Sequence, residues 1–268
     1  MDRSTVAPPV PPGVRPPGLG EALGMIVLYF VMQLALSGLL GLLMGAITGI
    51  GRRGRSLAAI SAQLRQLFAQ PDANALLVIL TLLITAGVML WLLRRRWPVL
   101  WSHAQPPGFG LTRSGRPLFY AVAVVCGLAL PIIGSWLTQW LAHGHEVTQD
   151  IKQLGGATSL ALRIPLVLVV ISAGPLVEEL LFRGVLLSAL LQRMPVGWAV
   201  AGSSLLFACM HLPELGWLWY AVPSLALLAA VLAWLRLYTG SLWPAVVAHG
   251  VNNLLAVVAW FVVLNPPT

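Results

Sequence analysis

Long apolar runs separated by short polar segments dominate the chain and indicate a bundle of membrane-spanning helices. An uncharged window of roughly 20 apolar residues is the length that a helix needs to cross a bilayer. About seven such windows occur (six to eight), at residues 23–50, 74–93, 118–142, 164–192, 196–212, 217–237 and 242–264. The pattern therefore predicts an all-α fold, a polytopic transmembrane helical bundle.

Two stretches outside these windows have patterns of their own. Residues 1–20 are rich in proline and poor in bulky apolar side chains, which predicts a disordered, extended tail. Between the first two windows, apolar residues recur at helical spacing beside Arg65 and Gln66, which predicts a helix lying flat in the membrane interface. These apolar residues are Leu57, Ile60, Leu64, Leu67 and Phe68.

The pattern divides the chain into three parts. We expect the proline-rich tail at 1–20, N-terminal transmembrane helices with the interfacial helix at 21–150, and a helical core at 151–268. No internal repeat and no long linker after the tail is evident, so the helices are expected to form one bundle.

Composition supports a membrane protein and excludes a water-soluble domain. Of the 268 residues, 58% are hydrophobic and 9% are charged, which is more apolar surface than a soluble domain of this size can bury. The 16 basic residues outnumber the 8 acidic ones, but they stand in short clusters between apolar runs. This arrangement flanks a bilayer, so the expected partners include membrane lipid and exclude nucleic acid. Cys126 and Cys209 lie inside apolar runs and are interpreted as small hydrophobic residues.

The distribution of basic residues between alternate loops predicts an internal N-terminus. Nine lie on the predicted inner face, namely Arg3, Arg15, Arg94, Arg95, Arg96, Arg113, Arg116, Arg193 and Arg236. Six lie on the opposite face, namely Arg52, Arg53, Arg55, Arg65, Lys152 and Arg163.

Ionisable residues at membrane depth are confined to the second half of the chain. The first three spans contain no Asp, Glu, Lys, Arg or His, whereas the last four contain several. Each such residue costs at least about 2.5–3.5 kcal/mol at the centre of a membrane helix. We therefore expect these residues to form a functional site.

The first group of polar residues lies in the fourth span, just after Gly174-Pro175, where a kink is expected. Glu179 and Arg183 are four residues apart and share a helix face, which predicts an ion pair, whereas Glu178 points about 100° away. A carboxylate in a poorly hydrated cavity suits a general base or acid. The alternative for the Glu179–Arg183 pair is a structural ion pair that holds helices together.

Two further groups lie in later spans. His211 ends the fifth span, and His249 shares a face of the seventh span with Asn253, four residues further on. Counted along their helices from the Arg193 loop, Glu178 and His211 lie at about 21 and 22 Å. This common depth predicts that the groups converge on one cavity. A backbone-bonded histidine and interhelical hydrogen bonds are the structural alternatives.

The three groups together form a pattern, Glu-Glu-x-x-x-Arg, Phe-x-x-x-His and His-x-x-x-Asn on successive late spans. This pattern resembles the CAAX-protease and bacteriocin-processing (CPBP, also called ABI) family of intramembrane glutamic endopeptidases. The resemblance covers about residues 160–262, with no substitution at the motif positions, whereas the segment before residue 150 shows no motif. It implies a metal-independent protease without a cofactor, acting on a membrane-associated protein or peptide.

The resemblance also implies roles for the motif residues. Glu178 would activate a water that His211 helps to position, while His249 and Asn253 would receive the developing oxyanion. Glu179 and Arg183 would have a supporting, orienting role. The short Arg-rich chain suggests a multi-pass protein of a bacterial inner (cell) membrane, where prenylated substrates are not expected.

Three other functions are consistent with the same residues. Glu178, His211 and His249 are acceptable zinc ligands, although no His-Glu-x-x-His spacing is present. A scaffold or immunity-type membrane protein would bind a peptide in the same polar cavity without cutting it. A transporter is disfavoured because the chain has no repeated halves. The loop histidines His103, His143 and His145 receive no role.

Overall fold

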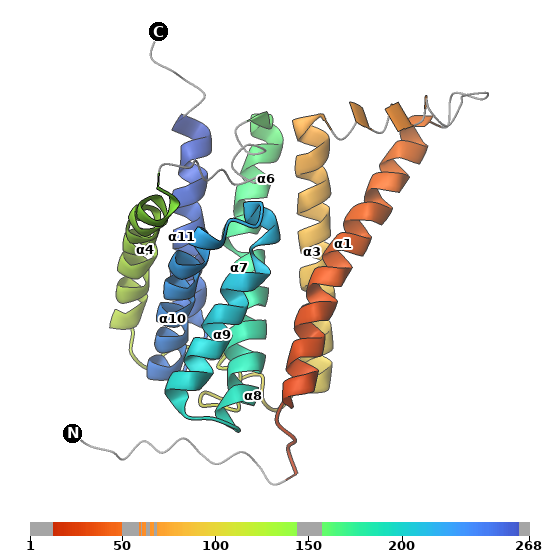
Figure 1. The fold of residues 1–268 in the computed structure, drawn as a ribbon. Coiled ribbons are helices and arrows are strands. Elements are labelled where there is room, and N and C mark those ends of the chain that lie inside the picture. The colour runs from red at the N-terminus through yellow and green to blue at the C-terminus, as the bar shows by residue number, and fades with distance from the viewer. Residues whose placement is uncertain are drawn as a thin grey trace.

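The fold is a bundle of helices that run alternately in opposite directions (Figure 1). A computed structural model describes residues 13–49, 59, 61–62, 65–66, 69–143 and 157–262. The helices are α1 (Leu19–Gly49), α3 (Pro71–Arg96), α4 (Leu118–Ala142), α6 (Leu160–Ile171), α7 (Ala173–Glu179), α8 (Leu187–Leu191), α9 (Val196–Met210), α10 (Val222–Thr239) and α11 (Trp243–Val262). A π-helix, η1 (Leu180–Leu186), joins α7 to α8, and two 3₁₀ turns, η2 (Pro213–Leu215) and η3 (Trp219–Ala221), join α9 to α10. These residues contain no strand, which agrees with the all-α prediction.

Five helical segments are long and apolar enough to cross a membrane. They are Leu19–Ile47, Pro71–Arg96, Leu118–Ala142, Leu160–Leu191 and Trp219–Thr239. α9 is apolar but has only 15 residues, and α11, with 20 residues, is not among the five. Helices therefore occupy all seven predicted windows, and the length and composition of five of them are those of a multi-pass membrane protein.

The segment from α6 to α8 forms the centre of the bundle. It contacts α3 and α11, and its η1 and α8 portions contact α1 and α9 (Figure 1). All side chains from residue 179 to residue 190 are buried. A helix that is buried all round must be apolar all round, apart from polar groups that find partners inside the protein. Glu179 and Arg183 are the charged residues of this buried stretch, so they need partners inside the protein.

Several element boundaries differ from the predicted windows. α1 begins at Leu19, so its first two residues, Leu19 and Gly20, belong to the helix and not to the predicted tail. α10 begins at Val222, five residues later than predicted, since the two 3₁₀ turns and the short loop between them occupy residues 213–221. The expected kink occurs at Ser172, two residues before Gly174-Pro175, where the backbone leaves helical geometry.

Two arginines assigned to the membrane flanks are instead buried. Arg236 is completely buried and donates a hydrogen bond to the carbonyl of Gly108, which ties the α3–α4 loop to α10. Arg163 is 8% exposed and donates to the carbonyl of Thr158. Neither counts as a solvated flanking charge, so the orientation of the chain stays a prediction. The predicted interfacial residues Leu57, Ile60, Leu64, Leu67 and Phe68 lie outside the described residues, as do residues 1–12 of the tail and His145.

α11 packs unusually close to its two neighbours through glycines. A Cβ atom on Gly127 of α4 would lie 2.6 Å from the Ala248 carbonyl oxygen of α11. A Cβ atom on Gly250 of α11 would lie 2.4 Å from the Ile171 carbonyl oxygen at the end of α6. Small residues at these two contacts allow the backbones to approach closely, as is common in membrane helix pairs. The position of α11 therefore depends on both glycines.

We expect Gly250→Ala to destabilise the protein, because the added methyl group would overlap a backbone carbonyl that cannot move aside. Overpacking of this kind typically costs about 1–3 kcal/mol. The measurement is the thermal denaturation midpoint of the purified protein in detergent. Gly24→Ala in α1 is the matched control, since a Cβ there meets no atom within 4 Å and alanine favours an exposed helix. Equal midpoints for the two variants would contradict the close packing of α11.

Candidate active site

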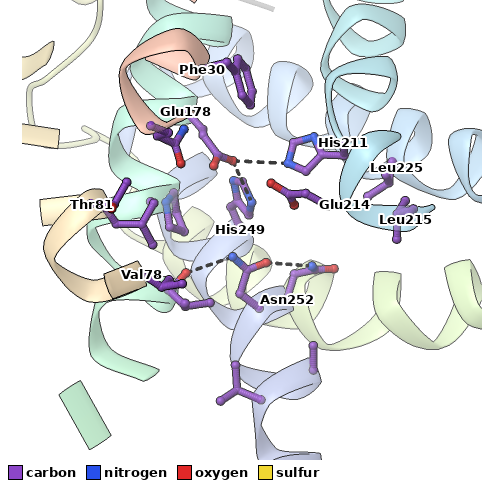
Figure 2. Close-up of a pocket in the computed structure, with 18 of the residues that line it drawn as sticks. Phe30, Val78, Thr81, Glu178, His211, Glu214, Leu215, Leu225, His249 and Asn252 are labelled. Atoms are coloured by element: carbon purple, nitrogen blue, oxygen red, sulfur yellow. Dashed lines mark hydrogen bonds and ion pairs between the residues drawn. The ribbon is translucent and has the colours of Figure 1, made fainter. Parts of the chain in front are cut away.

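The polar residues of the late helices meet at a cavity of about 660 Å³ inside the bundle. Its wall includes residues from α1, α3, α7, the α9–η2 region, α10 and α11. Glu178, His211, His249, Asn252 and Asn253 all line it, and Figure 2 shows the Glu178 carboxylate facing the two imidazoles. Three elements that are far apart in the sequence therefore bring their polar groups to one place.

Glu178 lies opposite both histidines. Its Oε2 atom is 3.8 Å from Nε2 of His211 and 3.7 Å from Nε2 of His249. These distances exceed the 2.7–3.2 Å of a direct hydrogen bond. They are short enough for a single water-sized group to contact the carboxylate and either imidazole together. The Glu178 and His211 side chains keep 17% and 18% of their surface exposed, so this part of the cavity is open to small molecules.

The second ring nitrogen of each histidine fixes the protonation pattern. Nδ1 of His211 is 2.8 Å from the carbonyl oxygen of Phe207, and Nδ1 of His249 is 2.9 Å from Oε1 of Glu179. Carbonyl and carboxylate oxygens only accept hydrogen bonds, so both Nδ1 atoms donate. In a neutral ring, Nε2 then presents its lone pair to the cavity. A neutral imidazole can therefore accept a proton or a hydrogen bond at Nε2.

Glu179 faces away from the cavity and anchors a buried polar chain. Its Oε1 atom accepts from Nη1 of Arg183 at 2.9 Å and from His249 Nδ1. Arg183 also donates to the Ala229 carbonyl of α10, and Glu179 and Arg183 are at most 1% exposed. The predicted ion pair is present and is extended by His249. Because Arg183 balances the charge of Glu179, the Glu178 carboxylate has no cation of its own on α7.

Phe207 packs among these groups from α9. Its ring centroid lies 4.5 Å from that of His211 and 5.7 Å from that of His249. The guanidinium carbon of Arg183 lies 4.5 Å from the same ring, within the range of a cation–π contact. The Phe-x-x-x-His spacing therefore places one aromatic ring against both imidazoles and Arg183, and restricts how the rings can turn.

The break between α6 and α7 has a direct role in the site. Pro175 has no N–H, so it cannot donate to the carbonyl of Ile171 four residues earlier. Near this break, the Asn253 side chain donates to the carbonyl of Val170 at 3.0 Å, and the Asn253 oxygen accepts from Asn252. Gly250 packs on the Ile171 carbonyl beside it. The local helix break therefore provides the surface on which α11 is seated.

α1 contributes a residue that sequence reasoning missed. The hydroxyl of Tyr29 is 3.5 Å from Oε1 of Glu178, and the side chain is 2% exposed. Gln33 and Ser37 of α1 also line the cavity, as does Glu214 of η2, whose side chain turns toward it in Figure 2. The predicted span within α1, residues 23–50, carries no charge, and Glu214 lies between two predicted spans. The signal available in the sequence was the spacing of Tyr29, Gln33 and Ser37, which recur every four residues and so share one helix face.

All six predicted site residues thus come together, with Glu178, His211, His249 and Asn253 on the cavity and Glu179 and Arg183 behind it. In the part of the chain that the structure describes, no group of three His, Cys, Asp or Glu side chains is arranged to hold a metal ion.

Comparisons with known proteins point to the same region. Residues 160–255 match the model of the family described as type II CAAX prenyl endopeptidase Rce1-like. Comparison with curated proteins and with solved structures found no significant match. The matched segment runs from α6 into α11 and holds every motif residue, from Glu178 to Asn253. The resemblance to the CAAX protease family inferred from the motifs is therefore confirmed for residues 160–255, the segment of this chain that is similar to the Rce1-like endopeptidases.

Proposed function

We propose that this protein is an intramembrane endopeptidase that hydrolyses a peptide bond of a membrane-associated protein or peptide through a water activated by Glu178. The observation that carries the proposal is the approach of Nε2 of His211 and Nε2 of His249 to within 3.8 Å of Glu178 Oε2 in a cavity inside the bundle. The similarity to an endopeptidase family supports the same reaction class. We place the protein in a bacterial inner membrane.

Glu178 acts as the base in this proposal. One water hydrogen is donated to Glu178 Oε2 and the other to Nε2 of His211, whose lone pair faces the cavity because Nδ1–H is committed to Phe207. The water oxygen attacks the carbonyl carbon while its proton passes to Glu178. When the tetrahedral intermediate collapses, the C–N bond breaks and Glu178 returns the proton to the leaving amine. The carboxylate is thereby regenerated.

His249 and Asn253 stabilise the oxyanion of the intermediate. Asn253 uses one N–H on the Val170 carbonyl and has a second N–H for a ligand. His249 can donate from Nε2 only as an imidazolium, since its Nδ1–H is directed at Glu179. Glu179 orients the His249 ring through this hydrogen bond, and Arg183 holds Glu179 in place. This gives Glu179 and Arg183 the positioning role.

Glu178→Gln is expected to abolish cleavage without unfolding the protein, because an amide of nearly the same shape cannot act as a base. Loss of a general base typically lowers turnover about 10²–10⁴-fold. Membrane proteomes of cells carrying the native chain and the variant are compared for a precursor that accumulates with the variant. Glu21→Gln is the matched control, since Glu21 pairs with Arg96 and neither residue is part of the cavity lining. Continued processing with Glu178→Gln would favour a non-catalytic peptide-binding scaffold.

His249→Ala and Asn253→Ala are expected to slow turnover far more than they weaken substrate binding, since their hydrogen bonds strengthen at the transition state. Removal of one oxyanion donor typically lowers kcat about 10²–10³-fold. The measurement is the separate determination of kcat and KM on the precursor that accumulates with Glu178→Gln. Equal losses in kcat and in affinity would argue against the oxyanion role.

Cleavage by the purified protein is expected to be insensitive to metal chelators. The donor set of one carboxylate and two imidazoles is also one that zinc uses, which makes a zinc-dependent protease the competing mechanism. The measurement is the cleavage rate of the precursor before and after incubation with EDTA and 1,10-phenanthroline. Loss of activity with chelator, restored by added zinc, would replace the glutamate mechanism by the metal-dependent one.

A further inference from the structure

The polar residues of α1 form a stripe along one face of the helix. Within the apolar part of α1, Tyr29, Gln33 and Ser37 recur at intervals of four residues, which places them one above another on one face. Tyr29 reaches Glu178, and Gln33 and Ser37 line the cavity. On other faces of the same helix, Val31 and Leu34 are 54% and 78% exposed. The stripe extends about 12 Å away from Glu178.

Carboxamide groups from other helices line the same cavity as this stripe. Asn74 of α3 and Asn252 and Asn253 of α11 line the same cavity as Gln33. Each carboxamide offers two N–H donors and one acceptor oxygen, so it can donate to the C=O and accept from the N–H of a peptide group. These four side chains make this side of the cavity wall polar, and Asn252 also donates to Asn253, which donates to the Val170 carbonyl.

Much of the remaining wall of the cavity is apolar. Leu215 of η2, Leu225 and Leu228 of α10, and Val257 of α11 line it. An extended peptide presents its N–H and C=O groups along its edges and its side chains to the two faces, alternately. Such a peptide can direct its edges to the carboxamides and an apolar side chain to the leucines. Among the described residues, no lysine or arginine lines the cavity, so acidic side chains next to Glu178 and Glu214 are disfavoured.

We propose that the α1 stripe with Asn74 is a substrate subsite that binds the main chain of an extended, uncharged peptide beside the scissile bond. The inference rests on the proposed function and adds the class of substrate and the contribution of α1, which lies outside the matched segment. A stripe of about 12 Å accommodates three to four extended residues at about 3.4 Å each. Recognition through the main chain makes the subsite tolerant of sequence but demanding of extended conformation.

The test measures binding, so it does not depend on cleavage. The full chain carrying Glu178→Gln is reconstituted in nanodiscs of phosphatidylethanolamine and phosphatidylglycerol. The probes are two fluorescein-labelled libraries of ten-residue peptides with randomised uncharged side chains, one of them N-methylated at alternate amides. N-methylation removes main-chain donors and keeps the side chains. Affinities are read by fluorescence anisotropy.

With the stripe intact, the unmethylated library is expected to bind more tightly, by about fivefold for each hydrogen bond lost on methylation. With Gln33→Leu and Ser37→Ala added, affinity should fall and the difference between the libraries should shrink, because the donors and their partners belong to one interaction. Leu34→Ala, on the exposed face of the same helix, is the matched control and should leave the difference unchanged.

Three results would overturn the subsite. The first is equal binding of both libraries to the protein with the intact stripe. The second is a difference between the libraries that stays as large after the double substitution. The third is no binding of either library. Thermal denaturation midpoints show whether each variant is folded. The proposed protease function is decided separately, by whether the precursor is processed with native Glu178, so each proposal can fail without the other.

Discussion

An ionised side chain inside an apolar bundle is tolerated only when a partner of opposite charge or several hydrogen-bond donors are fixed beside it. Glu179 meets this condition through Arg183, one turn further along the chain, and through His249 on α11. Because the partners come from two helices, the same contacts that neutralise the carboxylate also hold α11 against α7. The hydrogen bond from Nδ1 to Glu179 fixes the orientation of the His249 ring, and this orientation directs Nε2 toward Glu178 in the cavity.

The two neighbouring glutamates consequently have different surroundings. Glu179 is fully buried and committed to its partners, whereas Glu178 retains exposed surface and faces two imidazole nitrogens at distances that leave space for a small reactant. An α-helix turns by 100° per residue, so adjacent carboxylates necessarily point to different environments. Two adjacent glutamates on one helix can therefore have different roles, with Glu179 in a buried ion pair and Glu178 facing the cavity.

The helix break at Ser172 and the glycine contacts show how backbone geometry supports the site. A proline without an N–H leaves a carbonyl without its helical donor, and α11 uses that region as a packing surface through Gly250 and Asn253. The π-helix that follows Glu179 continues the same irregularity, and π-helical turns are frequent at functional sites. A straight, regular helix from Leu160 to Leu191 would offer α11 no such seat.

The sequence by itself determined the helical bundle, the positions of its apolar segments, the four polar residues on the cavity and the Glu179–Arg183 pair behind it, because apolar length and polar residues inside apolar helices are local properties of the chain. The pairing of Glu179 with Arg183 followed from spacing alone. Tertiary structure decided what spacing does not contain: that Arg236 is buried rather than flanking, that α9 stops at Met210, and that α1 lines the site through Tyr29 and Gln33. The spacing of these neutral side chains marks one face of α1, but only the packing of α1 shows that this face meets Glu178, since hydrogen bonding between distant helices depends on geometry that no single helix encodes.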